Sequence, residues 1–305
     1  MTSEGSVIED HIDFGYLPKE VTISNSLLSI VPKTDFQARL IQPEFLSNSI
    51  VEKDWIFLSR VKTVHSHRNF GLNKTHDFYF DSKTLDVGTA NFLIWCLGFF
   101  YGMRLTTLER GFVDTTPIKT GNLVDFVLMQ ERQLGDILLF LAQKFCNDSD
   151  QKNLLVSAIN ALFLSQSPLN YQFESFQFIY MAIDAIFCLV KKQTDEAVLK
   201  SQFHKKEFIP HTERLDRLCS KFNIKADLKF TKSVVNIRND LMHQAMVTDS
   251  PMGYSIFPQN HGNMQLKLKN LVCRLIIGSM GLMLKGSEYF SGIDDHMTSG
   301  IEFIF

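Results

Sequence analysis

The chain has 305 residues, 45% of them hydrophobic and 21% charged, which is enough for two globular domains and excludes a disordered chain. The net charge is −2, so no global basic field attracts nucleic acid, and any RNA would have to bind a local patch. Phenylalanine is frequent, with 27 residues, which predicts well-filled hydrophobic cores.

The cysteines, the N-terminus and the most apolar segment together favour a cytoplasmic protein. The cysteines are widely spaced without a CxxC pair, which predicts buried free thiols in a reducing compartment. They are Cys96, Cys146, Cys188, Cys219 and Cys273. The acidic N-terminus has no signal-peptide pattern. Segment 91–103 is the most apolar, but a bilayer span needs about 20 residues, so we expect a buried core helix and no membrane partner.

The first half of the chain favours strands. Within residues 1–85, short stretches rich in β-branched and aromatic residues are separated by turn-forming residues. The expected strands cover residues 21–23, 29–31, 55–64 and 77–80. Helices are expected near 90–103 and 122–145, with a loop or a further strand across 110–123. The polar segment 147–150 marks the expected boundary, so residues 1–150 are predicted to form a β-rich recognition or regulatory domain with helices.

The second half favours helices throughout. The expected helices cover residues 152–165, 170–192, 212–222, 226–247 and 264–285, with a loop or short hairpin across 250–263. Residues 151–305 are therefore predicted to form an all-α helical bundle, and the whole chain is predicted to belong to the α+β class.

Segment 234–247 carries the polar residues that bear most directly on function. It holds no Gly or Pro, and at about 100° per residue its apolar side chains share one broad arc. Arg238 falls inside that arc. Because a guanidinium keeps its charge when buried, it needs a carboxylate, a phosphate or a set of carbonyl groups, or it must extend along its stem to solvent. Asn239 and His243 lie four residues apart at the polar edge, so the amide can orient the imidazole.

The run R-N-D-L-M-H that begins at Arg238 resembles the R-x4-6-H motif of the HEPN superfamily, of the ApeA-like ribonuclease type. The residue after the arginine in that motif is typically Asn, Asp or His, and here it is Asn239. The resemblance covers about residues 153–290. It implies an all-α domain, dimerisation and metal-independent ribonuclease activity, with Arg238, His243 and Asn239 as catalytic residues and Asp240 in a supporting place. The implied setting is a toxin or phage-defence system with an antitoxin or regulatory partner.

These residue types suit the cleavage of RNA by its own 2′-hydroxyl. That reaction needs a proton acceptor for the hydroxyl, a proton donor for the leaving 5′-oxygen and positive charge at the phosphorane. Imidazole exchanges protons near neutral pH, and guanidinium binds phosphate while staying charged. One Arg and one His are few groups, so we expect a homodimer in which two motif helices face each other across one composite site. No cofactor or metal is expected.

Several other polar residues have two interpretations each. Glu174 and Asp184 lie on a polar stripe of the helix expected over 170–192, where they are either solvated or partners of Arg238, with Asp184 preferred. The N-terminal histidines are either metal ligands or, as we expect, exposed surface residues. They are His65, His67 and His76. A basic run near residues 191–206 is either solvated or a contact for a phosphate backbone. It consists of Lys191, Lys192, Lys200, Lys205 and Lys206.

Two alternatives to a nuclease stay open. One is a non-catalytic HEPN-like module that dimerises, binds RNA or nucleotide, or accompanies a nucleotidyltransferase. The other is an unrelated helical scaffold in which the R-x4-H spacing arose by chance. The sequence has no Walker loop, G-x-G-x-x-G, H-E-x-x-H or G-x-S-x-G motif that would indicate a different chemistry.

Overall fold

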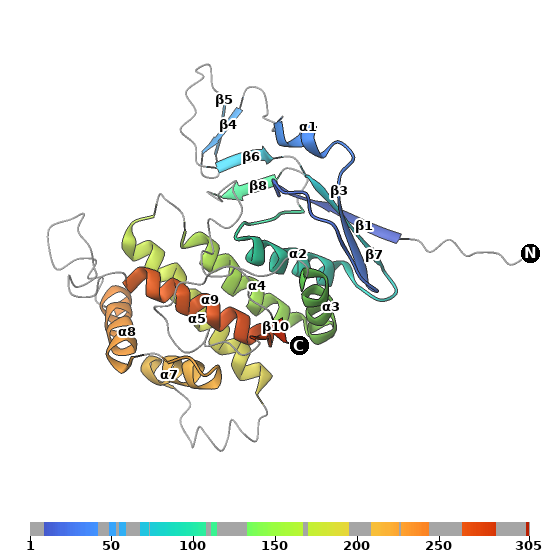
Figure 1. The fold of residues 1–305 in the computed structure, drawn as a ribbon. Helices are drawn as coiled ribbons and strands as arrows, with labels where there is room; N and C mark the ends of the chain where they lie inside the picture. The colour runs from blue at the N-terminus through green and yellow to red at the C-terminus, as the bar shows by residue number, and fades with distance from the viewer. Residues whose placement is uncertain are drawn as a thin grey trace, which may run out of the picture. The chain divides into compact units, whose positions relative to one another are not determined.

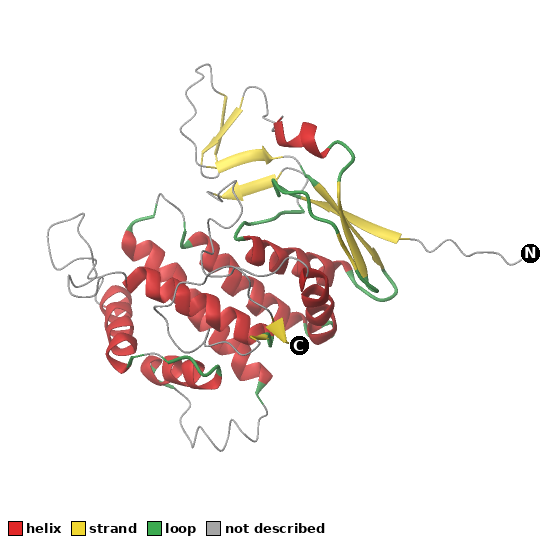
Figure 2. Cartoon of the chain, viewed as in Figure 1, coloured by secondary structure: helices red, strands yellow, loops and turns green. Residues whose placement is uncertain are grey.

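The computed structural model describes residues 9–41, 49–52, 55–58, 68–72, 74–107, 111–114, 133–166, 170–194, 209–225, 227–243, 264–284 and 303–304. The chain divides into two compact units, Met1–Lys152 and Asn153–Phe305, which we call the N-terminal unit and the C-terminal unit. Most of the described strands belong to the first unit, and the longest helices belong to the second (Figure 1, Figure 2). The expected α+β class is therefore confirmed.

The N-terminal unit contains an antiparallel sheet with the strand order β1-β7-β3-β2. Its strands are β1 Glu9–Phe14, β2 Ile23–Ser24, β3 Leu28–Pro32 and β7 His76–Asp81. The central strand β7 alternates strictly, because His76, Phe78 and Phe80 are buried while the residues between them are partly exposed. This period of two is the pattern of a strand with one face on a core. The sequence predicts β7, β3 and part of β2, but not β1.

Two further strand pairs and a short helix complete the β-rich part. The elements are β4 Ser49–Glu52 with β5 Trp55–Leu58, β6 Arg68–Leu72 with β8 Gly111–Asp114, and α1 Phe36–Ile41. Strand β5 accounts for the start of the strand expected over 55–64, and residues 59–64 lie outside the described part. Strand β8 lies in the segment for which a loop or a further strand was expected.

Helix α2, Val87–Tyr101, is the buried core helix expected near 90–103. The carboxylate of Asp86 caps it by accepting the backbone N–H of Thr89 at 2.8 Å and the Thr89 hydroxyl at 2.6 Å. The hydroxyl hydrogen bond lowers the pKa of Asp86. Lys152 donates to the Thr89 hydroxyl oxygen at 2.7 Å, so a buried ammonium group finds its partners at this cap. Gly102 ends the helix with a φ of 64°.

Two helices connect the first half of the chain to the second. Helix α3, Leu134–Phe145, covers the end of the helix expected over 122–145, whose first part lies outside the described residues. Helix α4, Ser149–Leu164, contains the division between the two units. The polar segment 147–150 begins α4, because the Asp148 carboxylate accepts the backbone N–H of Gln151 at 2.8 Å.

The C-terminal unit consists mainly of helices. They are α5 Gln172–Gln193, α7 His211–Lys221, α8 Leu228–His243 and α9 Met264–Met280, together with most of α4. Helix α5 packs against α9, α7 and α8, so it is the shared neighbour of these helices (Figure 1). Two short strands, β9 Met283–Leu284 and β10 Phe303–Ile304, pair antiparallel, and in this detail the unit differs from the expected all-α bundle.

Helix α5 is long and apolar enough to cross a membrane by length and composition, the one such helix in the part of the chain that was searched. Half of its most apolar window is buried within the protein. Its buried residues, among them Phe176, Ile179 and Ile183, face the helices that pack on it. A core helix of a helical unit accounts for this composition.

Two expectations about single residue types are wrong. His76 is not a surface residue, since it is 0% exposed and its Nε2 accepts the backbone N–H of Val21 at 3.3 Å. The five cysteines are all free, but Cys146 and Cys188 are exposed rather than buried. Cys146 follows the last residue of α3 and precedes the exposed Asn147, and Cys188 lies on α5 three and four residues before the exposed Lys191 and Lys192.

Candidate active site on helix α8

Arg238 lies on α8 with its side chain directed toward α5. It is partly buried, and its guanidinium carbon Cζ lies 5.8 Å from the centre of the Tyr180 ring on α5. Its Nη1 donates to Oδ1 of Asn239 at 3.2 Å. A guanidinium over an aromatic face is attracted by the ring quadrupole, so Tyr180 and Asn239 both restrain this charge.

Tyr180 connects Arg238 to a histidine that the sequence analysis did not single out. Its hydroxyl lies 2.9 Å from Nδ1 of His211, the first residue of α7. Burial and the charge of Asp184 raise the pKa of Tyr180, while the nearby Arg238 and Arg214 lower it less. Tyrosine therefore keeps its proton at neutral pH and can donate it to Nδ1 of a neutral imidazole.

Asp184 lies one helical turn beyond Tyr180 on α5. Its Oδ1 is 3.3 Å from Nη1 of Arg214 and 3.8 Å from Nδ1 of His211. Arg214 is also held by the backbone carbonyl of Ile209, to which its Nε donates at 3.0 Å. The expected contact of Asp184 with Arg238 stays a prediction. What the structure adds is that α7 supplies this carboxylate with two other partners.

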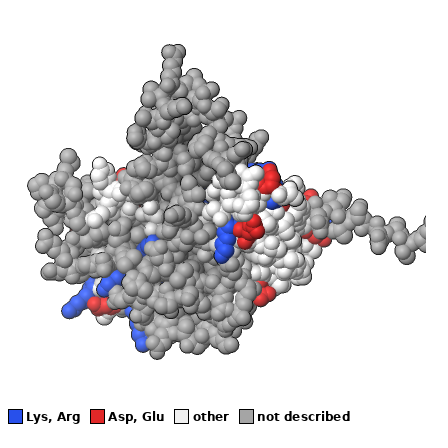
Figure 3. Space-filling view, turned by 45° about the horizontal axis from the view of Figure 1, so that its top comes forward, with Lys and Arg blue, Asp and Glu red and all other residues white. Residues whose placement is uncertain are grey.

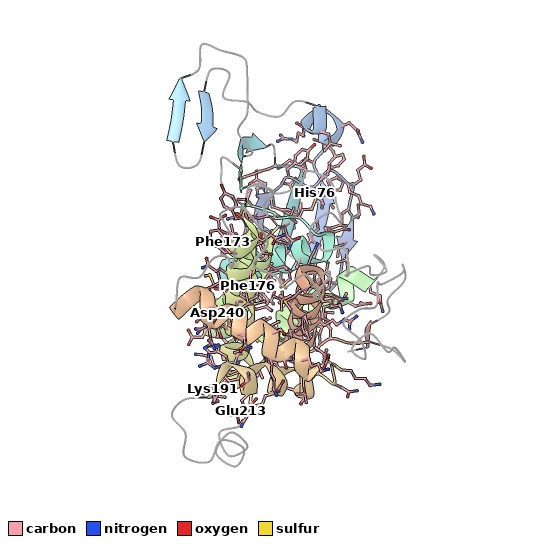
Figure 4. The ribbon with its side chains drawn as sticks, turned by 90° about the vertical axis from the view of Figure 1, so that its left-hand side faces the viewer. His76, Phe173, Phe176, Lys191, Glu213 and Asp240 are labelled. Atoms are coloured by element: carbon pink, nitrogen blue, oxygen red, sulfur yellow. The ribbon has the colours of Figure 1, made fainter. Side chains whose placement is uncertain are left out.

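The remaining acidic residues have different surroundings. Glu174 is a capping residue of α5, because its Oε2 accepts the backbone N–H of Tyr171 at 2.7 Å. Asp240 lies on α8 and is partly exposed (Figure 4). Its supporting role in the site stays a prediction.

The polar face of α8 leads toward the position of His243. At about 100° per residue, positions 229, 232, 236, 239 and 243 fall within an arc of about 80°. Lys229, Lys232 and Asn236 are exposed on this face. The side chain of His243 lies outside the described part of the structure, and so do the expected helix residues 244–247. The contacts of His243 with Asn239 and Arg238 therefore stay predictions.

The other predicted residues fall into two groups. Lys191 and Lys192 are exposed at the end of α5. Five lie outside the described residues: His65, His67, Lys200, Lys205 and Lys206. Within the described residues no group of three or more His, Cys, Asp or Glu is placed to hold a metal ion. On the face shown in Figure 3, the described basic side chains lie beside acidic ones, in keeping with the small net charge.

Comparison of the chain with models of protein families, with curated proteins and with solved structures gives no match. The function of α8 and its neighbours therefore has to be inferred from their chemistry.

Proposed function

We propose that this chain is a metal-independent endoribonuclease of the HEPN type, with Arg238, Asn239 and His243 in its active site. The placement of Arg238 is the observation that supports this most directly. Its guanidinium is restrained by the amide of Asn239 and the ring of Tyr180, on a helix whose polar face leads to the position of His243. A phosphate-binding group thus lies five residues, about 7.5 Å along the helix axis, from a residue that exchanges protons.

In the proposed reaction the 2′-hydroxyl of the RNA attacks the adjacent phosphorus. One imidazole takes the hydroxyl proton, and a proton is delivered to the leaving 5′-oxygen as the P–O bond breaks. Arg238 stabilises the negative charge that develops on the phosphorane oxygens. The products are a 2′,3′-cyclic phosphate and a 5′-hydroxyl. No metal ion is required, because guanidinium supplies the charge and imidazole supplies the proton transfer.

We propose a homodimer whose two-fold axis passes near Arg238 and His243. The second copy would supply a second imidazole, so that one histidine acts as base and the other as acid. The N-terminal unit would recognise the substrate or regulate the nuclease. The proposed setting is cytoplasmic, in a toxin or phage-defence system with an antitoxin or regulatory protein as a further partner.

The test is RNA cleavage by the full chain and its variants. Wild type should cleave RNA in the presence of EDTA, and RNA with a 2′-deoxy nucleotide at the cut site should resist. His243→Ala and Arg238→Ala should each lower the rate by at least about 10²-fold. His11→Ala is the matched control, because His11 is an exposed histidine of the N-terminal unit.

Cleavage that persists in His243→Ala, or that is lost with EDTA and restored by a divalent cation, would contradict the mechanism. Binding of RNA without cleavage, by wild type as well as by the variants, would favour the non-catalytic module.

A further inference from the structure

We propose that Tyr180 and His211 are positioning residues for Arg238, an inference that rests on the proposed function where it assigns phosphate binding to this arginine. His211 fixes the Tyr180 hydroxyl, and the Tyr180 ring in turn fixes the guanidinium. The three residues come from three helices, α7, α5 and α8.

The Tyr180 side chain is held at both ends. It is 5% exposed, and its hydroxyl lies 2.9 Å from Nδ1 of His211. The ring of Phe176, one helical turn earlier, lies 6.0 Å from the Tyr180 ring, centroid to centroid. The Tyr180 ring also contacts the guanidinium of Arg238, whose Cζ lies 5.8 Å from the ring centre. A ring restrained by a hydrogen bond and by packing offers Arg238 one fixed surface.

His211 is itself restrained, and it is too enclosed to act on RNA directly. Its side chain is 11% exposed, and its ring centroid lies 5.6 Å from that of Tyr180. Oδ1 of Asp184 lies 3.8 Å from Nδ1, and Nη1 of Arg214 lies 3.3 Å from the same oxygen. His211 therefore acts through Tyr180. It differs in this from the exposed residues on the polar face of α8.

The orientation of Arg238 matters because a guanidinium binds phosphate through paired N–H groups in a fixed plane. A misplacement of about 1 Å in a catalytic group can lower a rate by roughly 10²-fold. Without the hydroxyl bond the Tyr180 ring can tilt, and the plane of the guanidinium above it follows.

The first measurement reads the position of Arg238 without requiring activity. In full-length protein labelled with 15N-arginine, the Nε–Hε resonance of Arg238 is assigned by its disappearance in Arg238→Lys. We expect the ring current of Tyr180 to displace this resonance. Tyr180→Phe and His211→Ala should move it toward the position of an unrestrained arginine. His211→Asn should restore it, because the side-chain amide oxygen of Asn can accept the tyrosine hydroxyl near the place of Nδ1. Ser220→Ala, at an exposed position of α7, is the matched control.

The second measurement is cleavage. His211→Ala and Tyr180→Phe should lower kcat by roughly ten- to a hundredfold, and His211→Asn should recover most of that loss. An unmoved Arg238 resonance in both Tyr180→Phe and His211→Ala would overturn the inference, whatever their thermal stability. Failure of His211→Asn to recover either the resonance or the rate would also overturn it. If wild type cleaves no RNA, the proposed function fails, while the resonance still decides whether these residues position Arg238.

Discussion

Mild acid should destabilise the N-terminal unit through His76. This imidazole is 0% exposed on β7, where its Nδ1 lies 2.9 Å from the hydroxyl of Thr75 and its Nε2 accepts the backbone N–H of Val21 at 3.3 Å. Burial lowers the pKa of His76 from 6.5 to about 4, against the weaker opposing effect of Asp77. The folded unit therefore binds the proton less readily than the unfolded chain does.

The size and the pH window follow from linkage. Because the folded pKa is below the unfolded one, protonation favours the unfolded chain as the pH falls. The contribution of His76 is complete above about pH 6.5 and is lost as the pH falls from there toward 4. For a group with these two pKa values, the free energy of unfolding falls by about 2 kcal/mol between pH 7 and pH 5. The carboxyl groups of Asp13, Asp35 and Asp86 have lowered pKa values, so they keep their charge over this window.

Tryptophan fluorescence is the appropriate assay, since both tryptophans, Trp55 and Trp95, belong to the N-terminal unit. Urea unfolding of the full chain at pH 7, 6 and 5 should show the free energy of unfolding falling by about 2 kcal/mol. His76→Leu should be less stable at pH 7, by about 1–3 kcal/mol, because it leaves polar partners unpaired. It should also lose less stability than wild type on acidification. Equal stability of wild type at pH 7 and pH 5, or an equal pH slope in His76→Leu, would refute the reasoning.

Three further predictions concern the substrate, a helix cap and the assembly. The double substitution Lys229→Glu with Lys232→Glu should raise KM for RNA several-fold, and it should reduce the slope of log affinity against log salt by about 1.4 for single-stranded RNA. The control Lys83→Glu, at an exposed lysine of the N-terminal unit, should change neither quantity. Asp86→Ala should lower the free energy of unfolding by about 1 kcal/mol in thermal or urea unfolding, because the cap of α2 at Thr89 is lost. Light scattering at micromolar concentration should give the mass of a dimer, and a monomer both with and without RNA would contradict the composite site.

The fold was predictable where burial imposes a regular period. Strand β7 alternates with a period of two, and α5 repeats with the period of a helix, so both were recognised. Strand β1 was missed because half of its residues are acidic. Its Asp13 pairs with Lys74 at 2.7 Å and lies 3.7 Å from Lys33, two residues that are distant along the chain. A charged strand of this kind is stabilised by partners that no local pattern reveals.

The same limit applies to the candidate site. The angular position of Arg238 on its helix predicted an inward guanidinium that needs a partner, and the structure places it against Tyr180. His211 was not predicted, because 31 residues separate it from Tyr180 and no spacing rule relates them. Asp184 was predicted to form an ion pair because it lies on the polar stripe of α5. Its pairing with Arg214 depends on how α7 is oriented, which periodicity does not specify.

Different side chains of α5 contact Arg238 and Arg214, which matters for phosphate binding by Arg238 under the proposed function. Helix α5 offers the ring of Tyr180 to Arg238, and one turn later it offers the carboxylate of Asp184 to Arg214. His211 contacts both Tyr180 and Asp184, so it links the two arginine sites. Under the proposed function, a change at the Asp184–Arg214 pair should therefore be transmitted to Arg238 through His211 and Tyr180.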